Sequence, residues 1–153
     1  RWLAVQSSLY GLVRPGDRIP ADRLSGDTSI PGLGTVSAHW RGVLDPVVRE
    51  AAGSGLVVDL RSGTYAAFWR PGPDLAARVA TVRVLQQVGD QRKVVSHFNK
   101  ATKGRLVRAL LEHGEVAGTP AALADQVGAL GWKAELGRPD RHGTPIDVVV
   151  EDL

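Results

Sequence analysis

The apolar residues of this chain fall into many short runs, and this feature limits the folds that it can adopt. The runs at 56–58 and 148–150 are typical, each bounded by glycine or acidic residues. A helix that spans a membrane needs about 20 consecutive apolar residues, and no run approaches that length. Because 43% of the 153 residues are hydrophobic, we expect one compact cytoplasmic domain over residues 1–153, with a real core and no membrane contact.

Apolar runs with alternating polarity predict β-strands, several of them in hairpins. The runs at 78–85 and 93–98 flank a Gly89-Asp90 turn and predict one hairpin. A buried strand is expected at 2–7 and another at 56–60, and a C-terminal hairpin is expected from 132–136 and 146–151.

Capping residues and helical spacing predict the helices between these strands. Thr35 is a candidate N-cap for a helix through Val43, and Pro46 predicts a kink or a second helix that starts at Asp45. Further helices are expected at 62–69, 99–112 and 119–129. Because strands and helices interleave, the sequence predicts an α/β (mixed α+β) fold, a mixed sheet with hairpins flanked by helices.

Catalytic and metal-binding patterns are missing from the sequence. The chain has no cysteine and no methionine, which excludes disulfides, thiolate metal sites and a peroxide-reducing thiol within this segment. Its histidines are scattered without metal-ligand spacing, and there is no phosphate-binding glycine loop or nucleophile elbow. We therefore expect no catalytic residue, no metal site and no cofactor.

Charge is unevenly distributed along the chain. Residues 1–111 hold 16 Lys and Arg against 8 Asp and Glu, whereas residues 112–153 hold 3 against 8. A positive field of this kind favours polyanions, although an arginine-rich surface is the plainer interpretation. Six basic residues and no acid lie between Gln91 and Leu111, in a segment where an expected strand leads directly into an expected helix.

Two lysines in that segment form the first candidate site. At about 100° per residue, Lys100 and Lys103 fall on the expected buried side of the helix, which carries Leu106, Val107, Leu110 and Leu111. An anion such as phosphate at the helix N-terminus would explain two ammonium groups there. The alternative is that both lysines extend to solvent or pair with carboxylates of the sheet. Arg105 points the other way, toward a solvated face.

Three further patterns could carry ligands. Arg14, Arg18 and Arg23 lie in a loop that either follows a phosphate backbone or is held by internal ion pairs with nearby acids. The segment 59–65 brings Arg61, Ser62 and Tyr65 to the end of an expected strand, where α/β proteins bind ligands, but a helix cap and a core tyrosine explain it equally well. The Gly-x-Gly turn within 30–35 resembles a helix-hairpin-helix turn or is a plain glycine turn, and no first helix is evident at 22–28.

Four ordered blocks of residues resemble a known family. They are Ser8-Leu-Tyr-Gly-Leu-Val-Arg-Pro with Asp17 and Asp22-Arg-Leu, then His39-Trp, then Asp59-Leu-Arg-Ser-Gly-Thr-Tyr, and finally Ser96-His-Phe-Asn-Lys-Ala-Thr-Lys-Gly. Together they are similar to the YaaA family over residues 3–130. Asp22, Arg61, Thr64 and Ala101 depart from the family's pattern, and we expect the family's N-terminal segment to be absent from this chain.

The resemblance implies a cytoplasmic bacterial protein of the peroxide stress response that binds DNA in a basic cleft without catalysis. Its implied partner is double-stranded or structured DNA, and no oligomeric state is indicated. The rivals are an enzyme acting on a nucleobase or nucleotide in the same cleft, and a protein-interaction domain that uses the acidic tail. The candidate phosphate-binding residues are Arg14, Arg18, Arg23, Lys100, Lys103 and Arg105, and the candidate polar lining is Tyr10, Arg61, Ser62, Tyr65 and Ser96.

Overall fold

The computed structural model describes residues 2–61, 63–89, 91–94 and 99–151. The chain packs into two compact units, which we describe separately. The first unit consists of Arg1–Ser54 with Arg61–Arg70, and the second of Gly55–Leu60 with Pro71–Leu153. The expectation of a single domain over residues 1–153 stays a prediction. Among the described residues, no helix has the length and apolar character to cross a bilayer.

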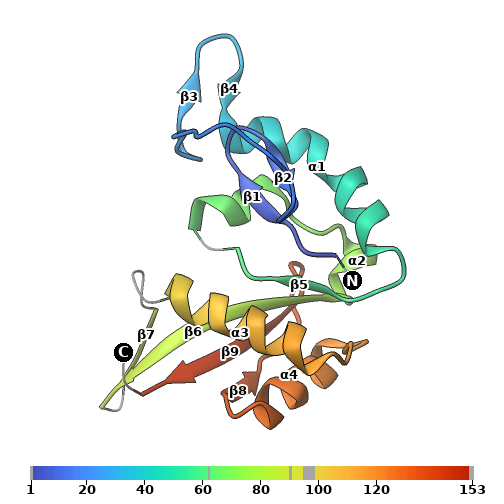
Figure 1. The fold of residues 1–153 in the computed structure, drawn as a ribbon, viewed down its shortest axis with the longest axis vertical. Coiled ribbons are helices and arrows are strands. Elements are labelled where there is room, and N and C mark those ends of the chain that lie inside the picture. Colours follow the sequence, from blue (N-terminus) through green and yellow to red (C-terminus); the bar gives the residue numbers. More distant parts are fainter. Residues whose placement is uncertain (1, 62, 90, 95–98, 152–153) are drawn as a thin grey trace. The chain divides into compact units, whose positions relative to one another are not determined.

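A five-stranded mixed sheet forms the centre of the second unit (Figure 1). Its strands are β5 (Val57–Asp59), β6 (Val79–Val88), β9 (Thr144–Val150) and β8 (Lys133–Leu136) in that spatial order, with β7 (Gln91–Val94) paired to β6. β5 and β9 run parallel to β6, whereas β7 is antiparallel to β6 and β8 is antiparallel to β9. This arrangement confirms the mixed α/β class, and both expected hairpins are present. The strand expected at 93–98 is β7 at Gln91–Val94, and residues 95–98 lie outside the described residues.

Helices α3 (Asn99–His113) and α4 (Pro120–Ala129) cover one face of this sheet. Because side chains alternate along a strand, Val82 and Val84 of β6 face the same side. They join Ile146 and Val148 of β9 in one buried cluster, and the helices contribute Leu106, Leu123 and Val127 to it. The core of the second unit therefore fixes α3 against the sheet through Leu106, which is completely buried.

The first unit is built from short strands and two helical segments (Figure 1). The strands form two ribbons, β1 (Val5–Ser7) with β2 (Gly11–Val13) and β3 (Ser29–Ile30) with β4 (Gly34–Thr35). Helix α1 (Val36–Ala52) follows β4, and η1 (Gly63–Phe68) is a 3₁₀ segment. As expected, Thr35 caps α1, because its side-chain oxygen accepts from the N–H of Ala38 at 3.2 Å.

The second unit also contains the short helix α2 (Pro73–Ala76), which comes before β6 in the sequence.

Two features of the first unit differ from the expectations. Helix α1 is continuous from Val36 to Ala52, so no second helix starts at Asp45. The kink expected at Pro46 as the alternative stays a prediction. Pro46 is exposed, whereas Leu44 is buried and packs the opposite face of the helix. The backbone hydrogen bond that proline cannot donate therefore lies on the solvent side, where its loss interrupts the helix least. The segment 2–7 forms a strand only from Val5, whose side chain is 56% exposed. It pairs with β2 alone and is not a buried strand.

Candidate functional site

Lys103 lies in the first part of α3 and is buried, with 8% of its surface exposed. Its side-chain amine donates a 2.8 Å hydrogen bond to the backbone carbonyl of Leu60, directly after the end of β5. Burial lowers the pKa of this amine, and the nearby charge of Asp59 opposes that shift in part. Lys103 therefore ties the start of α3 to the carboxyl end of β5 within the second unit.

Lys100 is exposed, so the two lysines do not share the buried side of α3 as expected. The buried residues of the helix are Asn99, Thr102, Lys103 and Leu106. They centre its inner face near Leu106, and at about 100° per residue Lys100 falls at the edge of that face. The sequence prediction counted Leu111 as buried, but Leu111 is 47% exposed. The predicted buried face of the helix was therefore placed too close to Lys100.

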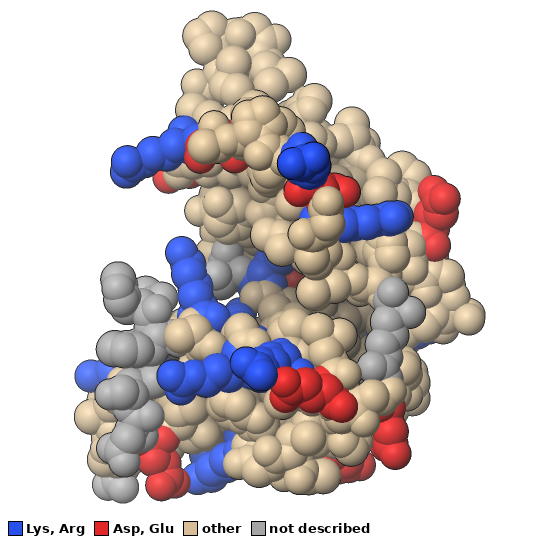
Figure 2. All heavy atoms as spheres, in the orientation of Figure 1, with Lys and Arg blue, Asp and Glu red and all other residues tan. Residues whose placement is uncertain are grey.

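The other cations of this segment divide into paired and unpaired groups. Arg92 forms an ion pair with Glu135 at 2.6 Å, and Arg108 pairs with Glu112 at 2.8 Å. Lys93, Lys100 and Arg105 are exposed, and within the described part of the chain no carboxylate pairs with them. Figure 2 shows Lys and Arg atoms gathered along α3. We call Lys100 and Arg105 the α3 cations, whereas Lys93 lies on β7.

The loop arginines, Arg14, Arg18 and Arg23, are all exposed in the first unit. Asp17 does not pair with a guanidinium, because its carboxylate accepts from the backbone N–H of Arg14 at 2.8 Å and closes a turn. The Arg14 guanidinium lies over the ring of Trp2, 5.0 Å from its centre. Among the described residues, none of the three makes an ion pair, and the expected alternative of internal pairing is not observed there.

The polar residues expected to line a ligand site at the end of β5 do not all lie in such a site. Arg61 donates to the carbonyls of Tyr65 at 3.1 Å and Trp69 at 2.9 Å, and its guanidinium lies over the Trp69 ring. These contacts hold η1 in place. Ser62 and Ser96 lie outside the described residues. Tyr10 donates its backbone N–H to the Ser7 hydroxyl and does not line a pocket described below.

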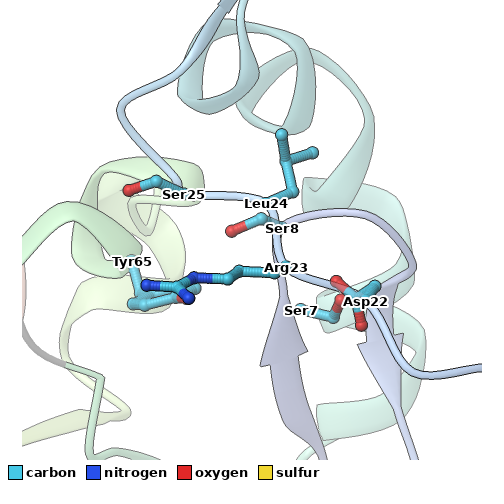
Figure 3. Close-up of a pocket in the computed structure, with 7 residues that line it drawn as sticks. All are labelled: Ser7, Ser8, Asp22, Arg23, Leu24, Ser25 and Tyr65. Atoms are coloured by element: carbon cyan, nitrogen blue, oxygen red, sulfur yellow. The ribbon is translucent and has the colours of Figure 1, made fainter.

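A polar pocket of about 510 Å³ lies within the first unit (Figure 3). Three segments meet there: the end of β1 and the residue after it, part of the arginine loop, and η1. Its lining residues are Ser7, Ser8, Asp22, Arg23, Leu24, Ser25 and Tyr65. Of the sequence candidates, Arg23 and Tyr65 are thus brought together, although 42 positions separate them in the sequence.

The other five lining residues were not among the sequence candidates: Ser7, Ser8, Asp22, Leu24 and Ser25. The available signal was the set of family-like blocks, because Ser8, Arg23 and Tyr65 each come from such a block. Spacing alone could not join them, since the contact depends on how three irregular segments pack.

The Gly-x-Gly turn is part of a β-hairpin. Gly32 and Gly34 have φ values of 79° and 86°, in the region that favours glycine, and they connect β3 to β4. Residues 21–28 contain no helix, so the first helix of a helix-hairpin-helix motif is missing and the plain glycine turn describes this segment.

A metal site is not formed by the described part of the chain, where no three His, Asp or Glu side chains group as ligands. The donors that the described residues offer are guanidinium, ammonium and hydroxyl groups. Such donors bind anions, phosphate in particular.

Comparison with known proteins places the chain in a family. A family model described as "Peroxide stress protein YaaA" matches residues 1–133. A UPF0246 protein of Streptomyces coelicolor is 51% identical over 155 residues, covering 100% of this chain and 59% of the relative. A UPF0246 protein of Corynebacterium efficiens is 41% identical over 140 residues, covering 88% of this chain and 54% of the relative. The chain thus spans little more than half the length of these curated relatives. It belongs to the family of the peroxide stress protein YaaA.

Proposed function

We propose that this chain binds DNA without catalysis, through contacts between exposed cations and backbone phosphates. One observation carries the proposal: two segments expose cations that no carboxylate in the described part of the chain neutralises. They are the loop arginines of the first unit and the α3 cations of the second. An unpaired cation on a folded surface can neutralise a backbone phosphate, and the counterions condensed on the DNA at that phosphate are then released to solution.

Lys103 has a positioning role in this proposal. Because its amine is hydrogen-bonded to Leu60 and buried, it holds the first turn of α3 while Lys100 remains on the exposed side of the same turn. Arg105 and Lys100 then present the cations of the helix to the phosphates. The role expected for Lys103 from the sequence was direct phosphate contact.

The protein-interaction rival is weakened by the acidic tail itself. In the structure, Glu112, Glu135 and Asp147 of the tail pair with arginines of their own chain, Arg108, Arg92 and Arg83. These three ion pairs reduce the negative charge that the tail offers to a basic partner. The enzyme rival retains Tyr65, which lines the polar pocket.

A link to peroxide stress through DNA fits the composition of this chain. With no cysteine or methionine, the chain has no thiol to reduce peroxide and no thioether to scavenge it. Binding of DNA that peroxide would damage is a role that needs neither group.

The test is a salt titration of binding to a labelled duplex. The logarithm of the binding constant should fall linearly with the logarithm of salt concentration, with a slope of about −0.9 for each phosphate contacted. The variant Arg14→Gln, Arg18→Gln, Arg23→Gln should have a slope that is less steep by about 2 to 3.

The matched control removes the same charge from cations that already have partners. The variant Arg83→Gln, Arg92→Gln, Arg108→Gln should keep the wild-type slope, because these guanidinium groups bind carboxylates. Binding without salt dependence, or an equal loss of slope in both triple variants, would contradict phosphate contact by the loop arginines.

A further inference from the structure

The polar pocket of the first unit contains a buried hydroxyl that lacks a partner. Ser8 is 5% exposed, and its buried Oγ has no hydrogen-bond partner among the residues that the structure describes. Its backbone is fixed, because its carbonyl accepts a 2.7 Å hydrogen bond from the indole N–H of Trp40. Figure 3 shows the hydroxyl directed toward the space bounded by Ser25, Arg23 and Tyr65. A buried polar atom in this state is stabilised when a ligand supplies its partner.

Hydrogen-bond donors dominate the surroundings of that hydroxyl. The Ser7 Oγ already accepts from the backbone N–H groups of Leu9 and Tyr10, so its own O–H remains to donate. Arg23 lines the same pocket, and its side chain crosses it in Figure 3 with the guanidinium extended toward Tyr65. In the described chain no carboxylate pairs with that guanidinium. Two hydroxyls and a guanidinium fork together match the oxygens of a phosphate.

An apolar pocket of about 140 Å³ adjoins the polar one, since Ser8 and Leu24 line both. Its other walls include Leu9, Leu33 and Trp40. The Trp40 ring meets the His39 ring edge to face, with 5.0 Å between the ring centres. Aliphatic and aromatic walls of this kind receive a flat, weakly polar ring.

We propose that these two pockets form one binding site for a nucleoside monophosphate. The phosphate binds Arg23, Ser7 and Ser8, and the nucleobase occupies the apolar pocket beside Leu24 and Trp40. Asp22, on the wall of the polar pocket, accepts from a sugar hydroxyl or a ring amino group. Inorganic phosphate would leave the apolar pocket empty, and a nucleoside would leave Arg23 without an anion.

The nucleotide has two sources that share this chemistry. It is either a free mononucleotide or a nucleotide of an unpaired DNA strand, and the second source rests on the proposed DNA binding. The site goes beyond phosphate contact along a duplex, because it recognises one nucleotide by both its anion and its ring.

Calorimetric titration of the protein with a nucleoside monophosphate, the matching nucleoside and inorganic phosphate tests the site. The monophosphate should bind at least about tenfold more tightly than either part, because each part makes only some of the contacts. A monophosphate that binds no more tightly than inorganic phosphate would overturn the proposal, since the apolar pocket would then contribute nothing.

Variants separate this site from a general positive field. Arg23→Gln should weaken monophosphate binding by about 10-fold or more and leave nucleoside binding unchanged, because it removes charged hydrogen bonds to the phosphate alone. Arg18→Gln is the matched control, from the same loop but outside both pockets, and should change neither. Equal weakening by the two variants would overturn the site.

The variant Ser8→Ala tests the hydroxyl in a protein that should still fold. Removing a hydroxyl that has no partner among the described residues should leave the melting temperature unchanged or raise it, while monophosphate binding weakens by about 2- to 10-fold. Unchanged binding in a folded Ser8→Ala protein would contradict the role of the hydroxyl and overturn the site.

Competition identifies the source. Because the proposed duplex contacts also include Arg23, the competition is measured with the matching nucleoside, which occupies only the apolar pocket. A single-stranded oligonucleotide that displaces the nucleoside from wild-type protein, while a fully paired duplex does not, assigns the site to an unpaired strand. If neither displaces it, the ligand is a free nucleotide. Failure of the proposed DNA binding is distinguishable from failure of this site. If the chain does not bind DNA, salt-dependent binding to the duplex is not observed, but the monophosphate still binds in the calorimetric titration.

Discussion

The side-chain amine of Lys103 donates to the backbone carbonyl of Leu60 across 2.8 Å. The contact joins the first part of α3 to the residue after β5, over 43 positions of sequence. It explains why a basic residue occupies the inner face of the helix, because the amine meets an acceptor there and the charge of Asp59 compensates part of its burial. One of the two lysines on which the sequence hypothesis relied therefore stabilises the second unit.

Stability should depend on pH through Lys103. Burial lowers the pKa of this amine in the folded protein below its ordinary value of 10.5. Between the lowered pKa and 10.5, the unfolded chain binds more protons than the folded one, so the free energy of unfolding rises with pH across that window. Wild-type protein should thus gain stability relative to Lys103→Met as pH increases, in urea unfolding at a series of alkaline pH values. A difference that stays constant or falls would contradict the burial of a charged amine.

Leu106 should be a major source of stability in the second unit. Its side chain is completely buried between α3 and the sheet, so Leu106→Ala should lower the free energy of unfolding by about 2 to 5 kcal/mol. Leu111 lies on the same helix and is 47% exposed, and Leu111→Ala should cost less than about 1 kcal/mol. Chemical denaturation of the two variants measures the difference, and equal losses would mean that α3 is rotated from the position described.

Two glycines of the second unit should respond to alanine with opposite signs. Gly104 lies within α3, and an added Cβ meets nothing within 4 Å, so Gly104→Ala should stabilise by about 0.5 to 1 kcal/mol through helix propensity. Gly143 has a φ of +121°, and a Cβ there would lie 2.5 Å from the carbonyl oxygen of Val79. Gly143→Ala should destabilise by more than about 2 kcal/mol. Thermal melts of both variants provide the comparison, and a stable Gly143→Ala protein would be inconsistent with the close packing of this turn against β6.

The sequence predicted the second unit more fully than the first. Alternation placed β6 at 78–85, and the structure has it at Val79–Val88; the expected helix at 99–112 is α3, Asn99–His113. These elements share one core, so local pattern and packing agree. In the first unit the ribbons are two or three residues long, and the backbone between Arg14 and Thr28 contains no regular element. Periodicity carries no information about such segments, which tertiary contacts position.

The candidate site was predicted in part. Exposure of the loop arginines was a simple expectation for charged residues, whereas Lys100 was expected on the buried side of its helix and is exposed. The ion-pair partners could not be predicted, because Arg108 pairs with Glu112 on its own helix whereas Arg92 pairs with Glu135 on another strand. The polar pocket could not be predicted from spacing, since Ser8, Arg23 and Tyr65 meet only when separate segments pack together. Arg61 looked like a ligand residue and is instead bonded to the carbonyls of Tyr65 and Trp69.

The most direct test compares two cations of α3 that differ in their ion pairing. Lys100 has no ion pair in the described chain, whereas Arg108, on the same helix, is paired with Glu112. In salt titrations of duplex DNA binding, Lys100→Gln should reduce the steepness of the slope by about 0.9, the contribution of one phosphate contact, and Arg108→Gln should leave it unchanged. Identical slopes for wild type and Lys100→Gln, or an equal reduction in both variants, would contradict the claim that unpaired cations hold the phosphates.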